Sequence, residues 1–134
     1  MRQRLRLVQF LALSLGLVVM GCGGSSSPVC KLTTISVSPP TAVANHTAAA
    51  PGNMQHFDAF DSTSIPGCVH ILSNLGTATW SVSDTTNISI SNVHDLTYGT
   101  ATCHGATAGA ATVTTTVPVG DGTNVTNTAS LTCN

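Results

Sequence analysis

Histidine and aspartate are the side chains of this sequence that could do chemistry, and both are scattered. The chain has five histidines and five acidic residues, all aspartate. The histidines are His46, His56, His70, His94 and His104, with no H-x-H or H-x-x-x-H pair. Metal ligands and catalytic groups must be brought together in space. We therefore expect no enzyme activity, no metal site and no cofactor, and a dispersed surface role for the histidines.

Two groups of acidic residues have simple structural interpretations. Asp58 and Asp61 are close in sequence, but solvation at a turn or strand edge explains them better than glycoside cleavage by paired carboxylates. The segment 121–124 (Asp-Gly-Thr-Asn) resembles part of a calcium loop, yet it lacks the acidic residues that would complete an oxygen cage. A hairpin turn is the prediction for that segment.

The cysteines indicate an oxidised, exported domain. The chain has five, namely Cys22, Cys30, Cys68, Cys103 and Cys133. Cys22 follows an apolar run, and the other four have no C-x-x-C pair that would start a zinc site. An even number in an exported chain predicts two disulfides, for which three connectivities are open.

Charge is concentrated at the N-terminus. Three of the four basic residues are Arg2, Arg4 and Arg6, so in the remainder Lys31 alone faces five aspartates, a net charge of −4. Phosphate binding needs several Lys or Arg side chains. The sequence therefore excludes a basic nucleic-acid surface.

The first 21 residues read as a signal for export. The basic residues precede an apolar run, Leu7–Met20, that is too short to span the roughly 30 Å of hydrocarbon in a bilayer. Its end, Val19-Met20-Gly21-Cys22, resembles the lipobox of bacterial lipoproteins. That resemblance implies cleavage before Cys22, acylation of its thiol and a lipid-anchored protein, with the outer membrane expected because Gly23 follows. Residues 22–30 would then be the lipidated cysteine and a Gly/Ser-rich tether.

The body, residues 31–134, reads as one all-β domain. Short runs of β-branched residues alternate with turn residues, and no helical period is sustained. This pattern predicts an antiparallel sandwich of about seven strands. The expected strands are Leu32–Ser38, Asn53–Asp61, Ala78–Ser83, Asn87–Ser91, Tyr98–Cys103, Ala111–Val117 and Thr126–Cys133.

Several of these segments resemble the bacterial immunoglobulin-like domains of group 2, found in intimin- and invasin-type surface proteins. The resemblance covers about residues 31–134 and rests most on the Thr-Trp-Ser-Val-Ser-Asp element at 79–84. It implies an immunoglobulin-like fold with Trp80 in the core. The segments that carry it are Ile35–Pro39, Gln55–Ala59, Ala78–Asp84, Ile88–Ile90 and Gly109–Thr114.

The implied sandwich narrows the disulfide pairing. Successive strands alternate in direction, so Cys30 and Cys68 would lie at one end and Cys103 and Cys133 at the other. A disulfide requires Cα atoms about 4.4–6.8 Å apart. The sandwich therefore favours Cys30–Cys68 and Cys103–Cys133.

Two classes of function remain. The first is a lipid-anchored envelope module, structural or adhesive, that binds an envelope protein or glycan through the loop Ser62–Thr77 or the loop Pro118–Asn127. Both loops would lie at the tether end, so the turn His104–Gly109 would suit a partner further out. The second is a periplasmic accessory protein that carries a small ligand or metal, which would require histidines within about 4 Å of each other.

Overall fold

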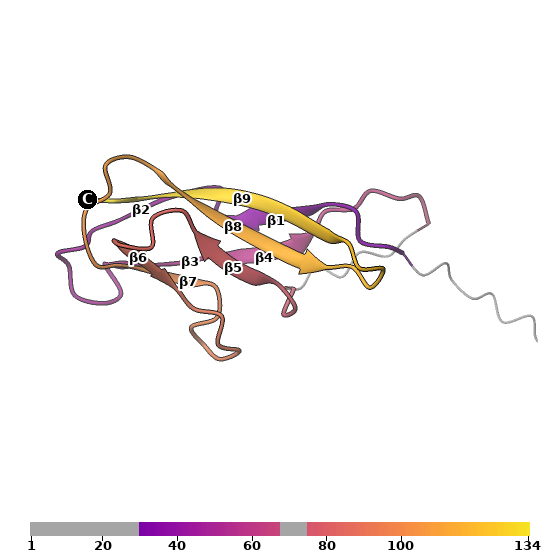
Figure 1. The fold of residues 1–134 in the computed structure, drawn as a ribbon, viewed down its shortest axis with the longest axis horizontal. Helices are drawn as coiled ribbons and strands as arrows, with labels where there is room; N and C mark the ends of the chain where they lie inside the picture. The colour runs from indigo at the N-terminus through magenta and orange to yellow at the C-terminus, as the bar shows by residue number, and fades with distance from the viewer. Residues whose placement is uncertain (1–29, 68–74) are drawn as a thin grey trace, which may run out of the picture.

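The computed structural model describes residues 30–67 and 75–134, which form strands and turns with no helix (Figure 1). The sequence predicts about seven strands, and these residues form nine. The strands are β1 (Ile35–Ser38), β2 (Thr41–Ala44), β3 (Met54–His56), β4 (Asp58–Asp61), β5 (Thr79–Val82), β6 (Ile88–Ile90), β7 (Thr100–Cys103), β8 (Ala111–Pro118) and β9 (Asn124–Cys133).

The largest sheet has four strands in the order β2-β9-β8-β5. β8 and β9 form a long antiparallel hairpin, and β2 pairs with β9 in parallel. Along β8 the side chains alternate strictly, with Ala111, Val113, Thr115 and Val117 buried and their neighbours more exposed. This period of two is what a half-buried strand requires, and β-branched residues pack well on such a surface.

The remaining strands form two smaller sheets that follow one another along the chain. One sheet is β1-β4 and the other is β3-β7-β6, with all pairs antiparallel. Phe57 separates β3 from β4 and donates its N–H to the carbonyl of Gly99 at 3.0 Å. The predicted strand Asn53–Asp61 is thus divided at Phe57, where the chain passes from pairing with β7 to pairing with β1. Phe57 and Ala59, two positions apart, are both fully buried.

Buried side chains from all three sheets meet in one core. Phe57 and Trp80 belong to this core, with ring centroids 6.4 Å apart. Gly99 borders this contact at a φ of +74°, and a Cβ there would lie 2.4 Å from the carbonyl oxygen of Phe57. Glycine is therefore required at position 99, because the backbone is left-handed and in close contact with the core.

β2 is the strand that the sequence analysis missed. It begins directly after Pro39-Pro40 and pairs along its length with the C-terminal half of β9. Two of its four residues are alanine, which has little strand propensity. Pairing with β9 overrides that weak local preference.

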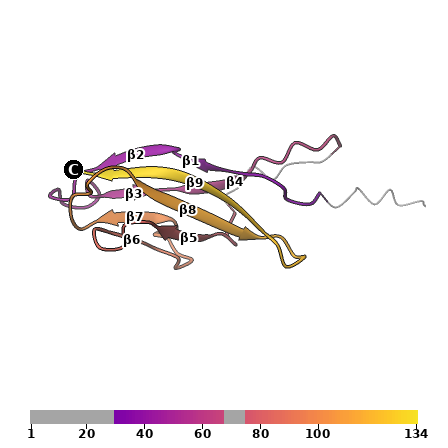
Figure 2. The same ribbon diagram turned by 45° about the horizontal axis from the view of Figure 1, so that its top comes forward.

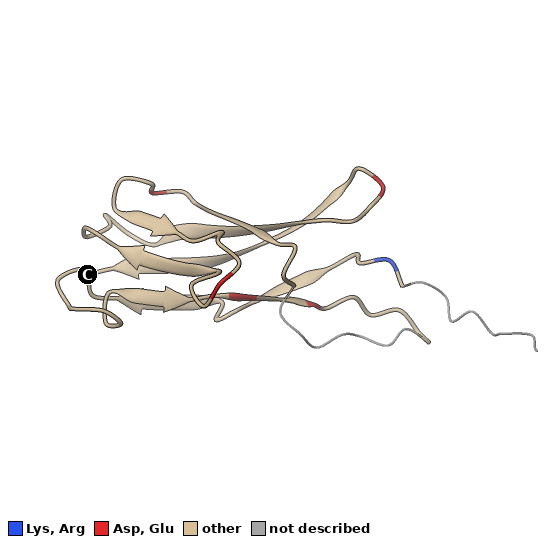
Figure 3. Ribbon diagram, turned by 90° about the horizontal axis from the view of Figure 1, so that it is seen from below, with Lys and Arg blue, Asp and Glu red and all other residues tan. Residues whose placement is uncertain are grey.

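The domain is elongated, and its two ends differ. Figures 1 and 2 show the first described residues at one end of the long axis and the C-terminus at the other. The turn between β8 and β9 lies at the N-terminal end, where Lys31 forms an ion pair with Asp121. The ends of β7 and β9 lie at the C-terminal end. No charged residue belongs to β2, β5, β8 or β9, so the described charges lie outside the four-stranded sheet (Figure 3).

Candidate functional site

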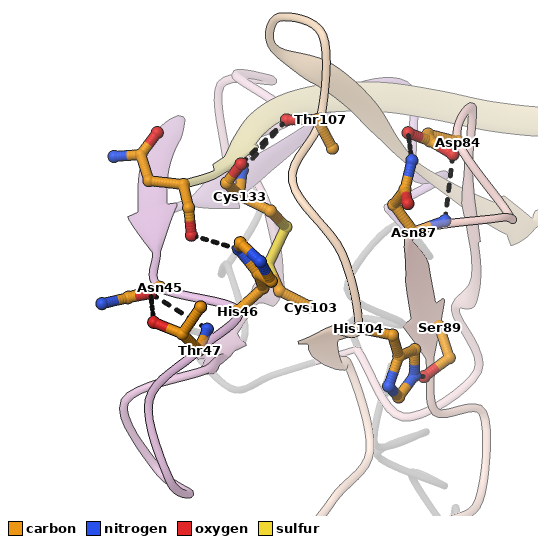
Figure 4. The surroundings of a disulfide bond; sticks show 11 residues. Asn45, His46, Thr47, Asp84, Asn87, Ser89, Cys103, His104, Thr107 and Cys133 are labelled. Carbon is orange, nitrogen blue, oxygen red and sulfur yellow. Dashed lines mark hydrogen bonds between the residues drawn. A yellow bond between two sulfur atoms is a disulfide. The ribbon is translucent and has the colours of Figure 1, made fainter.

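A disulfide joins the last residues of β7 and β9. Cys103 and Cys133 are both 1% exposed, with Cα atoms 5.8 Å apart. This pair is the predicted one, and the bridge connects the three-stranded sheet to the four-stranded sheet. Thr107 lies beside it: the Cys133 N–H donates to the Thr107 hydroxyl at 3.0 Å, and the Thr107 N–H donates to the Cys133 carbonyl at 2.9 Å (Figure 4).

The other predicted cysteine assignments fall partly outside the described residues. Cys30 is disulfide-bonded. Its predicted partner Cys68 lies in 68–74, outside the described part of the chain. Cys22, the predicted lipidation site, and the signal peptide and tether also lie outside it. The pairing Cys30–Cys68 and the lipidation of Cys22 therefore stay predictions.

The turn His104–Gly109 lies at the C-terminal end and is held by its neighbours. The His104 N–H donates to the carbonyl of Asn87 at 2.7 Å, and a Cβ at Gly105 would lie 2.4 Å from Asn87 Oδ1. Asn87 is in turn bonded to Asp84, which lowers the pKa of the Asp84 carboxyl (Figure 4). This turn therefore presents a defined backbone shape at the end of the molecule opposite Cys30.

The predicted binding loop Ser62–Thr77 is anchored at both ends. Thr63 is 2% exposed, and its hydroxyl accepts the N–H groups of Thr33 and Thr34 at 2.9 and 3.2 Å. At the other end, the Leu75 N–H donates to the carbonyl of Ala59 at 2.8 Å. The ends of this segment therefore belong to the packed domain. Residues 68–74, between them, lie outside the part of the chain that the structure describes.

The predicted loop Pro118–Asn127 is shorter than the sequence analysis expected. Pro118 still pairs with Asn124, so the turn spans 119–123 and residues 124–127 belong to β9. The predicted boundary is wrong because polar Asn and Thr residues pair as readily here as apolar ones would. Asp121 accepts the Thr123 N–H at 3.0 Å, and its ion pair with Lys31 holds the pKa of the Asp121 carboxyl well below its usual range. The predicted hairpin turn is confirmed.

The four described histidines make separate contacts. His46 bonds to the carbonyl of Asn134, His94 stacks on Tyr98, and His104 bonds to the Ser89 hydroxyl. Within 30–67 and 75–134, no group of three or more His, Cys, Asp or Glu side chains could hold a metal ion. The four described histidines thus contact different groups, and His70 lies outside the described residues.

Two of these histidines pair with hydroxyl groups on the outer surface. His104 Nε2 lies 2.7 Å from Ser89 Oγ. His56 lies between Thr100 Oγ1 and Asp58 Oδ1, at 3.1 Å from each. A hydroxyl beside an imidazole is the start of a nucleophilic site, but such a site also needs donors for a developing oxyanion and exclusion of water. Ser89, His56 and His104 are all exposed, so these contacts are those of surface side chains.

The segment between β6 and β7 is the surface feature that the sequence analysis did not single out. Leu96 is fully exposed and Val93 is 63% exposed. Behind them Asn92 bonds to Trp80, and the hydroxyl of the buried Tyr98 donates to the carbonyls of Ala78 and Leu75. Burial raises the pKa of the Tyr98 phenol, and the hydrogen bonds of Thr97 lower the pKa of Asp95. The signal available in the sequence was the presence of two apolar residues, Val93 and Leu96, in the segment between two strands.

Comparison with known proteins assigns no relatives. No protein-family model matches the chain, and no curated protein matches its sequence. Among the described residues, no helix is long and apolar enough to cross a membrane.

Proposed function

We propose that this protein is a lipid-anchored module of the bacterial cell envelope, with an immunoglobulin-like domain that binds another envelope component and performs no catalysis. Its anchor would be the acylated Cys22, exported by the signal in residues 1–21. The outer membrane is the proposed location. Its role would be structural or adhesive, with a protein or glycan as partner.

The strand order supports the immunoglobulin-like part of the proposal. In constant-type immunoglobulin domains one sheet has the order A-B-E-D and the other contains C-F-G. Here the first order is matched by β1 as strand A, β3 and β4 together as strand B, β7 as strand E and β6 as strand D. The second is matched by β5, β8 and β9 as strands C, F and G. The buried Trp80 on β5 matches the core tryptophan that the fold carries on strand C.

One observation carries the functional proposal: the domain begins and ends at opposite ends of its long axis. Cys30, the first described residue, lies eight positions after Cys22. A membrane anchor at Cys22 would therefore direct the disulfide Cys103–Cys133 and the turn His104–Gly109 away from the membrane. The ordered turn at this outward end is a suitable contact surface for a partner.

The experiment is expression of the full chain in a bacterium, followed by intact-mass analysis and fractionation. We expect acylated protein in the membrane fraction, and a Cys22→Ser variant that is unacylated and leaves that fraction. Cys103→Ser is the control for loss of a cysteine and should remain acylated. An unacylated native product, or membrane association that does not depend on Cys22, would overturn the proposal.

The alternative, a small-ligand or metal carrier, has less support. It requires histidines that converge, whereas the four described histidines each have their own partners. We therefore retain the envelope module as the proposed function.

A further inference from the structure

β2 is the outer strand of the four-stranded sheet, and its outer edge is open. Pro40 and Ala44 direct their carbonyls to β9, where the N–H groups of Ser130 and Asn134 bind them at 3.0 and 2.9 Å. Backbone polar groups of successive strand residues alternate in direction. Thr41 and Val43 therefore point their N–H and C=O groups away from β9, toward solvent.

In the smaller sheets, backbone groups on the outer edges of β1, β3 and β6 already take part in hydrogen bonds. On β1, the Ile35 carbonyl accepts the Asn127 side chain. On β3, the Met54 N–H donates to Pro51, and the His56 carbonyl accepts the Gln55 side chain at 2.7 Å. On β6, the Ile88 N–H donates to Asp84 at 3.1 Å. Side chains and turns thus bind at least one outward backbone group on each of β1, β3 and β6.

The opposite edge of the four-stranded sheet is occupied at Trp80, whereas in the described residues no hydrogen bond occupies the outward groups of Thr41 and Val43 on β2. Both backbone groups of Trp80 on β5 are bound by the Asn92 side chain. Native edge strands are commonly protected by short length, proline, charged side chains, covering segments or bulges. β2 is short and follows Pro39-Pro40, so the surface that it offers for pairing is limited to Thr41 and Val43. β2 carries no charged residue, and its Val43 side chain is 64% exposed. The contrast between the two edges of one sheet marks β2 as a surface for strand pairing.

Charge indicates which partner fits this edge. The domain carries Lys31 against five aspartates, so two copies repel each other over most of their surfaces. Residues 32–57, which include β2, contain no charged side chain, and neither does the adjoining β9 (Figure 3). Two copies of this chain can therefore meet at β2 without opposing like charges.

We propose that β2 pairs with β2 of a second copy, related by a twofold axis that passes beside Ala42. Strands joined through the same edge by such an axis are antiparallel. In this register Thr41 faces Val43 of the second copy, and each pair exchanges both of its outward N–H···O hydrogen bonds. Thr41 and Val43 are exposed on the same face of the sheet, so the valine of one copy packs on the threonine methyl group of the other.

The antiparallel arrangement determines where the two N-termini lie. β2 runs away from the N-terminal end of the domain, so an antiparallel pair directs the two Cys30 residues to opposite ends. This step rests on the proposed anchor at Cys22. Given that anchor, the pair joins copies on two facing membranes, and the adhesive partner of the module is the module itself.

A cross-linking experiment tests the pairing without requiring the anchor. Full chains carrying either Thr41→Cys or Val43→Cys are mixed in detergent under mild oxidation. We expect a disulfide-linked heterodimer several times more abundant than the homodimer of either variant, because the register places position 41 of one copy opposite position 43 of the other. With equal amounts of the two variants, a heterodimer no more than about twice as abundant as either homodimer, which is the ratio that random coupling gives, or no dimer at all, would overturn the pairing.

A vesicle experiment tests the consequence for adhesion. Neutral phosphatidylcholine vesicles carrying the acylated protein should cluster, and Val43→Lys should reduce clustering at least about tenfold, which corresponds to about 1.4 kcal/mol. Thr112→Lys places the same charge on the same sheet, at an exposed position of β8, and should leave clustering unchanged. Clustering that Val43→Lys does not reduce would overturn the role of β2.

The two experiments separate this inference from the proposed function. A cross-linked heterodimer from an unacylated chain would support the β2 pair and contradict the anchor. Acylated protein that neither cross-links nor clusters vesicles would support the anchor and overturn the β2 pair.

Discussion

The side-chain amide of Asn92 binds both backbone polar groups of Trp80. Its Oδ1 accepts the Trp80 N–H at 2.6 Å, and its Nδ2 donates to the Trp80 carbonyl at 2.9 Å. The amide takes the place of a neighbouring strand along the outer edge of β5. It also ties the segment after β6 to the four-stranded sheet, beside the aromatic core.

Replacing Asn92 by alanine should destabilise the domain by about 1–3 kcal/mol, because the Trp80 N–H and carbonyl lose their partners next to buried surface. Asn92→Asp should also be destabilising, since a carboxylate accepts the N–H but cannot donate to the carbonyl. Urea unfolding measures both. The control is Asn124→Ala at an exposed position, which should change stability by less than about 0.5 kcal/mol. Equal stabilities of the Asn92 and Asn124 variants would contradict this prediction.

Gly99→Ala should destabilise the domain by about 2 kcal/mol or more, because the left-handed backbone and the Phe57 carbonyl leave no room for a Cβ. Gly109→Ala is the matched control, since nothing lies within 4 Å of a Cβ there. Thermal unfolding of the two variants should separate them clearly. A Gly99→Ala protein as stable as Gly109→Ala would show that the close contact at Phe57 is absent.

Removing the disulfide between β7 and β9 should lower the free energy of unfolding of the domain. The double variant Cys103→Ala/Cys133→Ala opens a loop with a sequence separation of 30, which corresponds to about 3–4 kcal/mol in the chain-entropy account. Replacing both residues avoids an unpaired buried thiol. Urea unfolding of native and variant protein gives the difference, and unchanged stability would contradict a structural role for this disulfide.

Lys31→Ala should raise the pKa of Asp121 toward the ordinary carboxyl value. The pKa of Asp121 is lower in the folded than in the unfolded chain, chiefly through the Lys31 hydrogen bond and then through Thr123. Its contribution to stability is therefore present above about pH 4 and is lost as the pH falls through the lower folded value. Carboxyl carbon NMR titration measures the shift. A titration midpoint that Lys31→Ala leaves in place would contradict the ion pair.

Leu96→Ala should leave stability within about 0.5 kcal/mol of the native value, because Leu96 is fully exposed. Leu131→Ala makes the same chemical change at a fully buried position of β9 and should cost about 2–5 kcal/mol. Urea unfolding of both variants checks the exposure of the segment between β6 and β7. A cost at Leu96 close to that at Leu131 would show that this segment is packed.

The sequence predicted the strands whose residues alternate clearly. Thr79–Val82 and Ala111–Pro118 follow a period of two, with Trp80 and Val113 buried. β2 was not predicted, because Ala and Thr beside two prolines have little local preference for a strand. Its partner β9 also lies far along the chain, so no local pattern indicates the pairing. The predicted loop at Pro118–Asn127 was too long because pairing with β8 extends β9 through polar residues that the sequence pattern assigned to the loop.

The surface contacts, such as that between Asn92 and Trp80, depend on tertiary structure, and no local sequence pattern indicates them. Asn92 meets Trp80 only because the segment after β6 passes beside β5, and an asparagine there reads from sequence as a turn residue. The pair Cys103–Cys133 was predictable once strand directions were assigned. The lipobox resemblance at Cys22 lies outside the described residues and stays a prediction.

The position of β9 between β2 and β8 affects when the domain can fold. β9 comprises Asn124–Cys133, so β2 has no neighbour in its sheet until the last segment of the domain has been synthesised. The core contributions of Ala129, Leu131 and Cys133 arrive at the same late stage. The four-stranded sheet therefore forms only after β9 has been synthesised, and folding of this domain waits for its last strand.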